Sequence, residues 1–138
     1  AKGLRIEDRV TFTGQLPPSA VAGQLARADI VALPNPASAI STHSTSPLKL
    51  FEYMAAGKAI VASRLPSLGE VLTDEVNALL VTPGDPDALA GGIRRLVNDP
   101  ALRAGLGSAA RDAVAEYSWD RRAERLEILF NDVLAPTR

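Results

Sequence analysis

One short stretch near the middle of the chain combines residue types that could hold a phosphorylated ligand. Ser46 and Pro47 open a predicted helix, and the first backbone amides of a helix have no acceptor within it. The helix dipole adds partial positive charge at the same end, so the pattern suits a phosphate. Lys49 falls in the first turn, where the dipole disfavours a cation by up to about 1 kcal/mol. An anion beside Lys49 would account for it; a lysine that simply points into water is the alternative.

Glu52 follows Lys49 by one turn of the same predicted helix, between Phe51 and Tyr53. A carboxylate near a cleft can accept hydrogen bonds from both hydroxyls of a vicinal diol, and ribose offers such a pair. The alternative is an ion pair between Lys49 and Glu52, which would contribute only ~0.2–0.5 kcal/mol. Both can hold if Glu52 contacts the ribose and Lys49 contacts the phosphate, so the stretch leaves both interpretations open.

Two neighbouring features leave alternatives open. The segment Pro34–Thr45 is rich in Pro, Ser, Thr and Ala and follows a predicted strand. Ligands of parallel α/β sheets bind beyond the carboxyl ends of strands, so this segment is either a binding loop or an ordinary surface loop. Arg64 follows another predicted strand, where a surface role is favoured over a phosphate contact.

Two apolar periodicities alternate along the chain and predict an α/β domain. Runs without polar alternation indicate strands covered on both faces, as in a parallel sheet. The predicted strands are Val10–Gly14, Asp29–Leu33, Ala59–Ser63 and Ala78–Val81. The predicted helices are Pro18–Ala28 and Pro47–Ala56, followed by 86–98, 101–116 and 119–134. This alternation is typical of a parallel sheet with flanking helices.

The predicted helix ends carry local signals. Asp85-Pro86 and Asp99-Pro100 each pair an N-cap side chain with a proline at the first helical position, and Ser118 can cap the last helix. Gly57 can take positive φ after the Pro47–Ala56 helix. The last helix has an apolar stripe that we expect to face the core. This stripe consists of Trp119, Ala123, Leu126, Phe130 and Val133, with an aromatic platform as the alternative role of Trp119.

Composition excludes several function classes. The 138 residues carry a net charge of −1, which argues against a general nucleic-acid binder. There is no cysteine and His43 is the one histidine, so thiolate and multi-histidine metal sites are excluded and no metal or cofactor is implied. No apolar run reaches the ~18 residues of a membrane span, and no signal peptide is visible. No residue stands out as a nucleophile or general base, so the catalytic residues stay unassigned.

Six pieces of the sequence, in order, resemble the C-terminal half of a GT-B glycosyltransferase of the retaining family 4, also called glycosyl transferases group 1. The strongest piece is SPLKLFEYMAAGKAIVAS at Ser46–Ser63. The others are RVTFTG at Arg9–Gly14, ADIVALP at Ala28–Pro34, LPSLGEVL at Leu65–Leu72, NALLVTPGD at Asn77–Asp85 and YSW at Tyr117–Trp119. The resemblance implies a partial Rossmann-like domain that binds a nucleoside-diphosphate-sugar donor. The longer protein would transfer the sugar to an acceptor with retention.

The resemblance also implies roles for particular residues. The family has two glutamates separated by seven residues; the second falls on Glu52, for the ribose hydroxyls, and the first on Ser44. A serine lacks the carboxylate that contacts the donor sugar in the family, so this sequence departs from the pattern there. Ser46, Pro47 and Leu48 would lie along the diphosphate. Gly14, Gln15 and Leu16 match the turn that brackets the nucleobase.

By the same resemblance we expect residues 1–138 to be a truncated domain. The first two βα units and the N-terminal acceptor domain would be missing, so the chain alone should be inactive and bind donor weakly or not at all. The absent strands would lie between Val10–Gly14 and Asp29–Leu33. We expect these two strands to pair directly or to exchange between copies in a homodimer. The longer protein would bind a glycan or lipid-linked acceptor, in the cytoplasm or peripherally at the inner membrane face.

Two other functions remain open at this point. A nucleotide-sugar epimerase shares the architecture but would need a carboxylate and histidine set, for which only His43 is available. A non-catalytic α/β interaction module would use the Ser46–Ala56 helix only as scaffold.

Overall fold

A three-stranded parallel sheet forms the centre of the protein. The computed structural model describes residues 6–38 and 48–134. The strands β1 (Ile30–Leu33), β2 (Ala59–Ser63) and β3 (Leu79–Val81) lie side by side in chain order. Ile30 pairs with Ala59, and Val61 with Leu79, in the parallel registers. Three of the four predicted strands and the α/β class are therefore confirmed.

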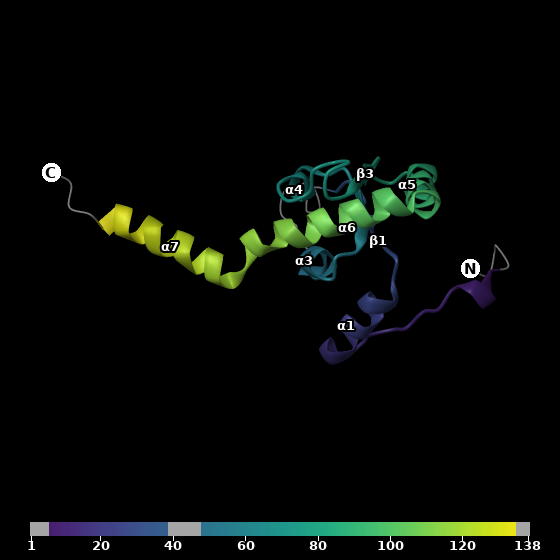
Figure 1. Ribbon diagram of the computed structural model, residues 1–138, viewed down its shortest axis with the longest axis horizontal. Helices are drawn as coiled ribbons and strands as arrows, with labels where there is room; N and C mark the ends of the chain where they lie inside the picture. Colours follow the sequence, from purple (N-terminus) through teal and green to yellow (C-terminus); the bar gives the residue numbers. More distant parts are fainter. Residues whose placement is uncertain (1–5, 39–47, 135–138) are drawn as a thin grey trace.

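Helices α3 and α4 lie on one face of this sheet, and α5 and α6 lie on the other (Figure 1). The helices of the described residues are α1 (Pro18–Arg27), α3 (Leu48–Ala55), α4 (Pro66–Gly69), α5 (Pro86–Asn98), α6 (Pro100–Val114) and α7 (Trp119–Leu134), with the short 3-10 turns η2 (Glu7–Arg9) and η3 (Ala115–Tyr117). Every predicted helix is present within a few residues of its expected ends. The last residues expected in the 101–116 helix belong to η3 instead.

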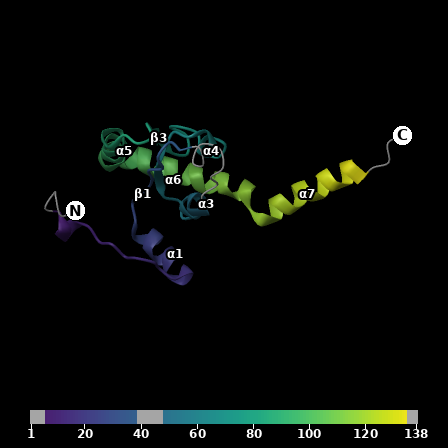
Figure 2. The same cartoon turned by 180° about the vertical axis from the view of Figure 1, so that it is seen from behind.

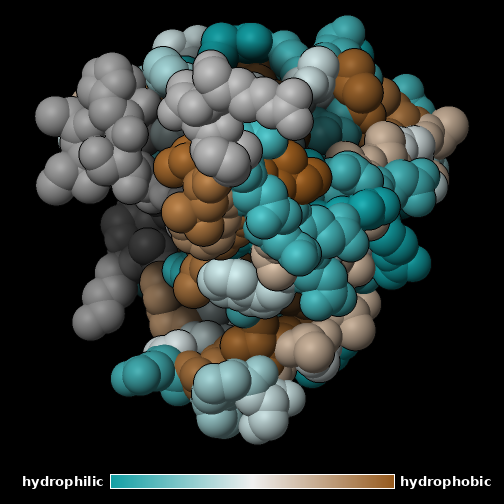
Figure 3. All heavy atoms as spheres, turned by 90° about the vertical axis from the view of Figure 1, so that its left-hand side faces the viewer, coloured by the Kyte–Doolittle hydropathy of each residue, from teal (hydrophilic) through white to brown (hydrophobic). Residues whose placement is uncertain are grey.

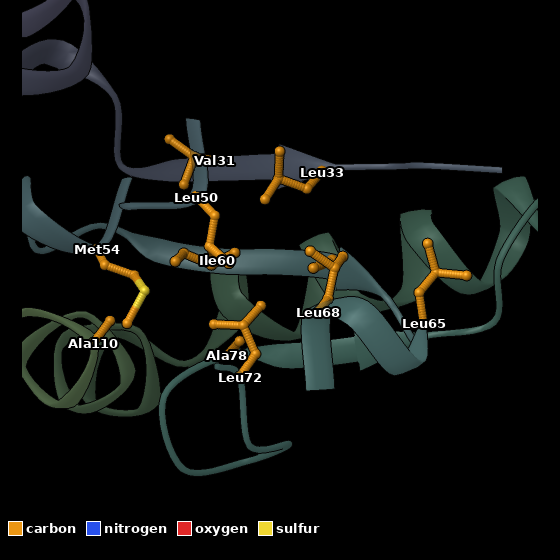
Figure 4. Close-up of a cluster of buried hydrophobic side chains, with 11 residues drawn as sticks. Val31, Leu33, Leu50, Met54, Ile60, Leu65, Leu68, Leu72, Ala78 and Ala110 are labelled. Carbon is orange, nitrogen blue, oxygen red and sulfur yellow. The ribbon is translucent and has the colours of Figure 1, made fainter. Parts of the chain in front are cut away.

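Strand β2 is the centre of two buried clusters. All five of its residues are buried, and alternate side chains point to opposite faces. Ile60 and Ala62 pack against α3 and α4, and Figure 4 shows Leu50 of α3 close to Ile60. On the other face, Val61 packs with Leu96 of α5 and Leu106 of α6. This two-sided burial explains why the strand sequence lacks polar alternation.

The predicted helix ends are confirmed where the structure describes them. The Asp85 carboxylate accepts hydrogen bonds from the amides of residues 87 and 88, and the Asp99 carboxylate accepts one from the Leu102 amide at 2.8 Å. Ser118 Oγ accepts one from the Arg121 amide at 3.3 Å. Gly57 takes a φ of 63°. Ser46 and Pro47 lie outside the described residues.

The close approach of α6 to the end of α3 fixes the position of α3. A Cβ at Gly107 would come within 2.4 Å of the Gly57 carbonyl oxygen, so only glycine fits there. The guanidinium of Arg111 also donates a hydrogen bond to the Ala56 carbonyl at 3.3 Å. These contacts hold the carboxyl end of α3. Its first turn lies at the other end of the helix, near the carboxyl end of β1.

The prediction of a strand at Val10–Gly14 is wrong for this structure. Val10 has extended dihedral angles, but no described strand lies beside this segment, and Phe12 is 83% exposed. An extended segment becomes a strand only when a neighbour supplies the hydrogen-bond ladder. Direct pairing of Val10–Gly14 with β1 is therefore also not formed. Exchange between two copies stays a prediction.

The expectation that the apolar stripe of α7 faces the core is wrong as well. No residue of α7 is buried, and the helix extends away from the sheet and its covering helices (Figures 1 and 2). The stripe residue Trp119 is 78% exposed. Helical periodicity predicts that a helix has one apolar face, but it does not say which surface that face meets.

Candidate functional site

The first turn of α3 opens onto a pocket at the carboxyl end of β1. The pocket has a volume of about 470 Å³, and Lys49 forms part of its wall together with the exposed Leu48. The strand side of the pocket is formed by Leu33, Pro34 and Asn35. The structure thus places Lys49 at a strand end, where ligands of parallel α/β sheets bind.

Glu52 lies on the neighbouring flank of α3. Its side chain is exposed and lines a cavity of about 580 Å³ between α1 and α3. Pro18, Val21 and Leu25 of α1 form the apolar wall of this cavity. Glu52 is therefore open to solvent and not turned into the protein interior, as a contact with ribose requires.

Lys49 and Glu52 do not neutralise each other. Although they are one helical turn apart, the ion pairs of the described residues do not include one between them, and the two side chains line different pockets. The Lys49–Glu52 ion pair, the alternative considered from the sequence, is not formed. Both groups can be used for a ligand that spans the two flanks of α3.

The segment of Gly14, Gln15 and Leu16 precedes α1, which forms one wall of the Glu52 cavity. Gly14 has a φ of 64° and the chain bends at Gln15, and α1 begins shortly after at Pro18. Pro18 itself lines the cavity. Gly14, Gln15 and Leu16 themselves do not line the cavity, so their predicted role at the nucleobase stays a prediction. Ser44, Ser46 and Pro47, the other predicted site residues, lie outside the described residues.

Two polar residues of the Lys49 pocket were missed by sequence reasoning. Tyr53 and Asn35 both line it and are half-buried. Burial, and then the neighbouring Glu52 carboxylate, raise the pKa of the Tyr53 phenol, so its hydroxyl stays protonated and can donate a hydrogen bond. The available signals were the spacing of four residues between Lys49 and Tyr53, and the place of Asn35 as the first polar residue after β1.

Arg64 has a structural role at the edge of the sheet. Its guanidinium donates hydrogen bonds to the Asp74 carboxylate and, at 2.8 Å, to the Leu80 carbonyl. Burial alone would raise the pKa of Asp74, but the Leu80 amide and the Arg64 guanidinium together hold it below its ordinary value. These contacts fix the end of β2 against β3 and favour the surface role of Arg64 over a phosphate contact.

Two classes of feature do not occur in the described part of the chain. Within residues 6–38 and 48–134, no group of three or more His, Cys, Asp and Glu side chains could hold a metal ion. Over the same residues, none of the helices has the length and apolar character needed to cross a membrane.

Comparison with known protein sequences finds one family and several relatives. The model of the family described as glycosyl transferases group 1 matches residues 1–99. A D-inositol 3-phosphate glycosyltransferase of Corynebacterium glutamicum is 30% identical over 98% of this chain and 31% of its own length. One from Salinispora tropica is 33% identical over 100% of this chain and 27% of its own length. The chain thus spans about a third of the length of the curated relatives it matches.

Solved structures share the fold over most of this chain. Sucrose-phosphate synthase from Thermosynechococcus elongatus superposes with a TM-score of 0.82 and 31% identity, over 99% of this chain and 33% of that one. Anabaena HepE in complex with UDP and glucose gives a TM-score of 0.74 and 27% identity, over 91% of this chain and 34% of that one. The fold described above is therefore that of a segment within longer proteins.

Proposed function

Since this chain belongs to the glycosyl transferases group 1 family, we propose that it is the donor-binding part of a glycosyltransferase. The longer protein would transfer a sugar from a nucleoside-diphosphate sugar to an acceptor. Residues 1–138 would form the nucleotide-sugar-binding domain, and a separate acceptor domain would supply the other side of the cleft. As a finer assignment, we propose membership of the retaining family 4.

The observation that carries this proposal is the arrangement around α3. Its first turn and Lys49 open onto the pocket at the end of β1, and Glu52 opens onto the adjacent cavity. A nucleoside diphosphate has the same order of groups, with phosphates next to a ribose diol. We place the diphosphate at the first turn and the ribose at Glu52. Anabaena HepE, which shares this fold, was solved in complex with UDP and glucose, and this supports a nucleotide sugar as the class of donor.

The remaining site residues follow from that placement. Ser46, Pro47 and Leu48 would lie along the diphosphate chiefly through their backbone, with the N–H groups of Ser46 and Leu48 as donors, because proline has no N–H. Ser44 would lie near the donor sugar, and the turn of Gly14, Gln15 and Leu16 would bracket the nucleobase. We assign no catalytic residue within the chain.

The chemical task of these residues is to stabilise the leaving group. As the bond between the anomeric carbon and the diphosphate breaks, negative charge grows on the phosphate oxygens. Amides at the start of α3 and the ammonium of Lys49 supply fixed positive potential there, which lowers the barrier because no reorganisation is needed. The acceptor hydroxyl gives its proton to an oxygen of the leaving diphosphate as its own oxygen forms the new bond to the anomeric carbon, and with retention it does so on the face that the diphosphate leaves. The acceptor domain would hold that oxygen in place.

The acceptor and the location belong to the same proposal. A glycan or a lipid-linked sugar would be the acceptor, bound mainly outside residues 1–138. The protein would then act in the cytoplasm, peripherally at the inner membrane face where lipid-linked acceptors lie. The epimerase and the interaction module are not favoured, because the matched family and relatives are glycosyltransferases by name.

A second copy of the chain is the proposed partner of the exposed Val10–Gly14 segment. In the described residues, β1 pairs only with β2, and the open edge of a buried strand is a template for another strand. We expect a dimer in analytical ultracentrifugation that Thr11→Pro dissociates, since proline cannot donate to the ladder. A monomer at every concentration of the unsubstituted chain would contradict the exchange.

The donor assignment is tested by binding of UDP to matched variants. Because the chain spans a third of its relatives' length, we expect weak binding and measure it by NMR titration, which detects millimolar affinity. Glu52→Gln should weaken UDP binding at least tenfold, as loss of hydrogen bonds to a charged group predicts (roughly 1.5–3 kcal/mol). Glu127→Gln on the exposed α7 is the control and should leave it unchanged. Equal affinity in both variants would overturn the role of Glu52.

A further inference from the structure

The pocket beside Lys49 and the cavity beside Glu52 lie on different flanks of α3. Leu48, the first residue of α3, lines the Lys49 pocket together with residues at the end of β1. If the ribose contacts Glu52 and the diphosphate lies at the first turn of α3, the group on the far phosphate leaves that turn on the side away from Glu52. It then enters the Lys49 pocket. In a nucleoside-diphosphate sugar, this group is the sugar.

Two neutral polar side chains from separate elements meet in this pocket. Asn35 follows β1, and its backbone amide donates a hydrogen bond to the Leu33 carbonyl at 3.0 Å, which fixes its position beside the strand end. Tyr53 lies one turn beyond Lys49 on α3. Both residues are half-buried. The fold therefore brings an amide and a phenol to the place where the sugar would lie.

Both side chains can still form hydrogen bonds. Within residues 6–38 and 48–134, the side-chain amide of Asn35 and the hydroxyl of Tyr53 have no hydrogen-bond partner. In the same part of the chain, no fully buried side-chain nitrogen or oxygen is unpaired, so these two groups reach open space. Burial, and then the Glu52 carboxylate, raise the pKa of Tyr53, so its hydroxyl keeps its proton.

These groups match the chemistry of a sugar. A sugar hydroxyl both donates and accepts hydrogen bonds, and the Asn35 amide offers a carbonyl acceptor and two N–H donors. The protonated Tyr53 hydroxyl adds a further donor, and Leu33 and Pro34 form an apolar wall for the C–H groups of the ring. The pocket volume of about 470 Å³ is within the ~300–1,000 Å³ that is common for small-molecule sites.

The surface at the α7 end has a different character. Hydrophobic side chains lie open there next to hydrophilic ones (Figure 3). Its Glu116 carboxylate is already held by Arg125 at 3.5 Å and by Arg121 at 4.0 Å. The unpaired amide and phenol near the end of β1 are therefore the better match for sugar hydroxyls.

We propose that Asn35 and Tyr53 select the sugar of the donor through hydrogen bonds to its hydroxyls. The inference rests on the proposed function and deepens it, because it names two residues that distinguish one nucleoside-diphosphate sugar from another. A site built to bind a particular hydroxyl disfavours a sugar that lacks or inverts it. Substitution of either residue should therefore change the affinity for the sugar and leave binding of the nucleotide intact.

The side-chain amide of Asn35 reports directly on the sugar in NMR spectra. We would titrate the full 138-residue chain with UDP and, in parallel, with UDP-glucose, UDP-galactose and UDP-N-acetylglucosamine. At least one UDP-sugar should shift the side-chain N–H signals of Asn35, whereas UDP alone should leave them in place. Equal shifts with UDP and with every UDP-sugar, or no shift with any of them, would overturn the proposal.

Matched variants test the two residues separately. Relative to UDP, the affinity for the best UDP-sugar should fall about threefold to tenfold in Asn35→Ala and in Tyr53→Phe, as expected for one lost hydrogen bond. Asn98→Ala, at the exposed end of α5, and Tyr117→Phe, outside this pocket, are the controls and should leave that ratio unchanged. A ratio that is equal in a variant and its control would overturn the assignment of that residue.

The outcome also separates this inference from the donor proposal. If UDP binding depends on Glu52 as proposed and no UDP-sugar reaches Asn35, the sugar assignment fails alone. If UDP binding is absent or insensitive to Glu52→Gln, the proposed donor site fails, and with it the premise of this inference.

Discussion

Strand β2 and helix α7 are both rich in apolar residues, yet all five residues of β2 are buried and no residue of α7 is. The strand lies between α3 and α4 on one face and α5 and α6 on the other. The helix leaves the domain after η3 and keeps its apolar stripe exposed (Figure 2). The difference shows that an apolar pattern marks the face of an element that can be buried. That face stabilises the fold only when another part of the protein covers it.

The largest expected effect on the free energy of unfolding comes from substituting an isoleucine of β2, and an isoleucine of α7 provides the comparison. Ile60 in β2 is fully buried, whereas Ile128 in α7 is 62% exposed. Ile60→Ala should lower the free energy of unfolding by about 2–5 kcal/mol, because it removes buried methyl groups and leaves a cavity. Ile128→Ala should change it by less than about 0.5 kcal/mol. Urea unfolding measures both, and similar losses would show that α7 is covered in solution.

The contact between α6 and α3 gives the second prediction. Gly107→Ala should destabilise the fold by about 1–3 kcal/mol, because the new Cβ would meet the Gly57 carbonyl oxygen. Gly105, in the same helix, has no atom within 4 Å of an added Cβ. Gly105→Ala should therefore be neutral or stabilise the protein by up to about 1 kcal/mol. Equal effects of the two substitutions would argue against the close approach.

A helix cap should matter less than either packing contact. Asp85→Ala removes the acceptor for the amides of residues 87 and 88 and should cost about 1 kcal/mol in thermal or urea unfolding. Asp112→Ala, at an exposed position late in α6, is the control and should cost nothing. A cap acts locally, so this effect should not depend on whether α7 is covered. An unchanged free energy of unfolding in the Asp85 variant would contradict the role of the cap.

The smallest effect concerns pH. The pKa of Asp74 is lower in the folded protein than its ordinary value, so the charged carboxylate stabilises the fold above that ordinary value. This stability is lost as the pH falls through the folded pKa. We expect less than about 1 kcal/mol, because the partner Arg64 is exposed. Asp74→Asn should flatten the acid side of the stability profile; an unchanged slope would rule out this contribution.

Local signals made much of the fold predictable. The proline and aspartate at the starts of α5 and α6, and the positive φ of Gly57, are properties of a few adjacent residues, and the structure confirms them. The apolar runs of β1, β2 and β3 likewise predicted a parallel sheet. The Val10–Gly14 segment failed because a strand needs a neighbour, and its sequence carries no information on whether that neighbour is present.

The candidate site was predictable only in part. Lys49 stood out because the helix dipole disfavours a cation in the first turn, and the structure places Lys49 and Glu52 at two pockets, while their roles stay predictions. The spacing of Tyr53 from Lys49 and the place of Asn35 after β1 were only weak signals, because the two residues meet only when β1 and α3 pack together. The exposed face of Trp119 was equally hidden, since its helical spacing is the same as that of a core residue.

The central claim is that the first turn of α3 holds a diphosphate. It is tested most directly by comparing UDP with uridine in NMR titrations of the backbone amides. We predict that UDP shifts the amides of Leu48 and Lys49 strongly while uridine does not, and that both ligands shift the amide of Glu52. Equal shifts of Leu48 and Lys49 with the two ligands, or shifts confined to other elements, would contradict the claim.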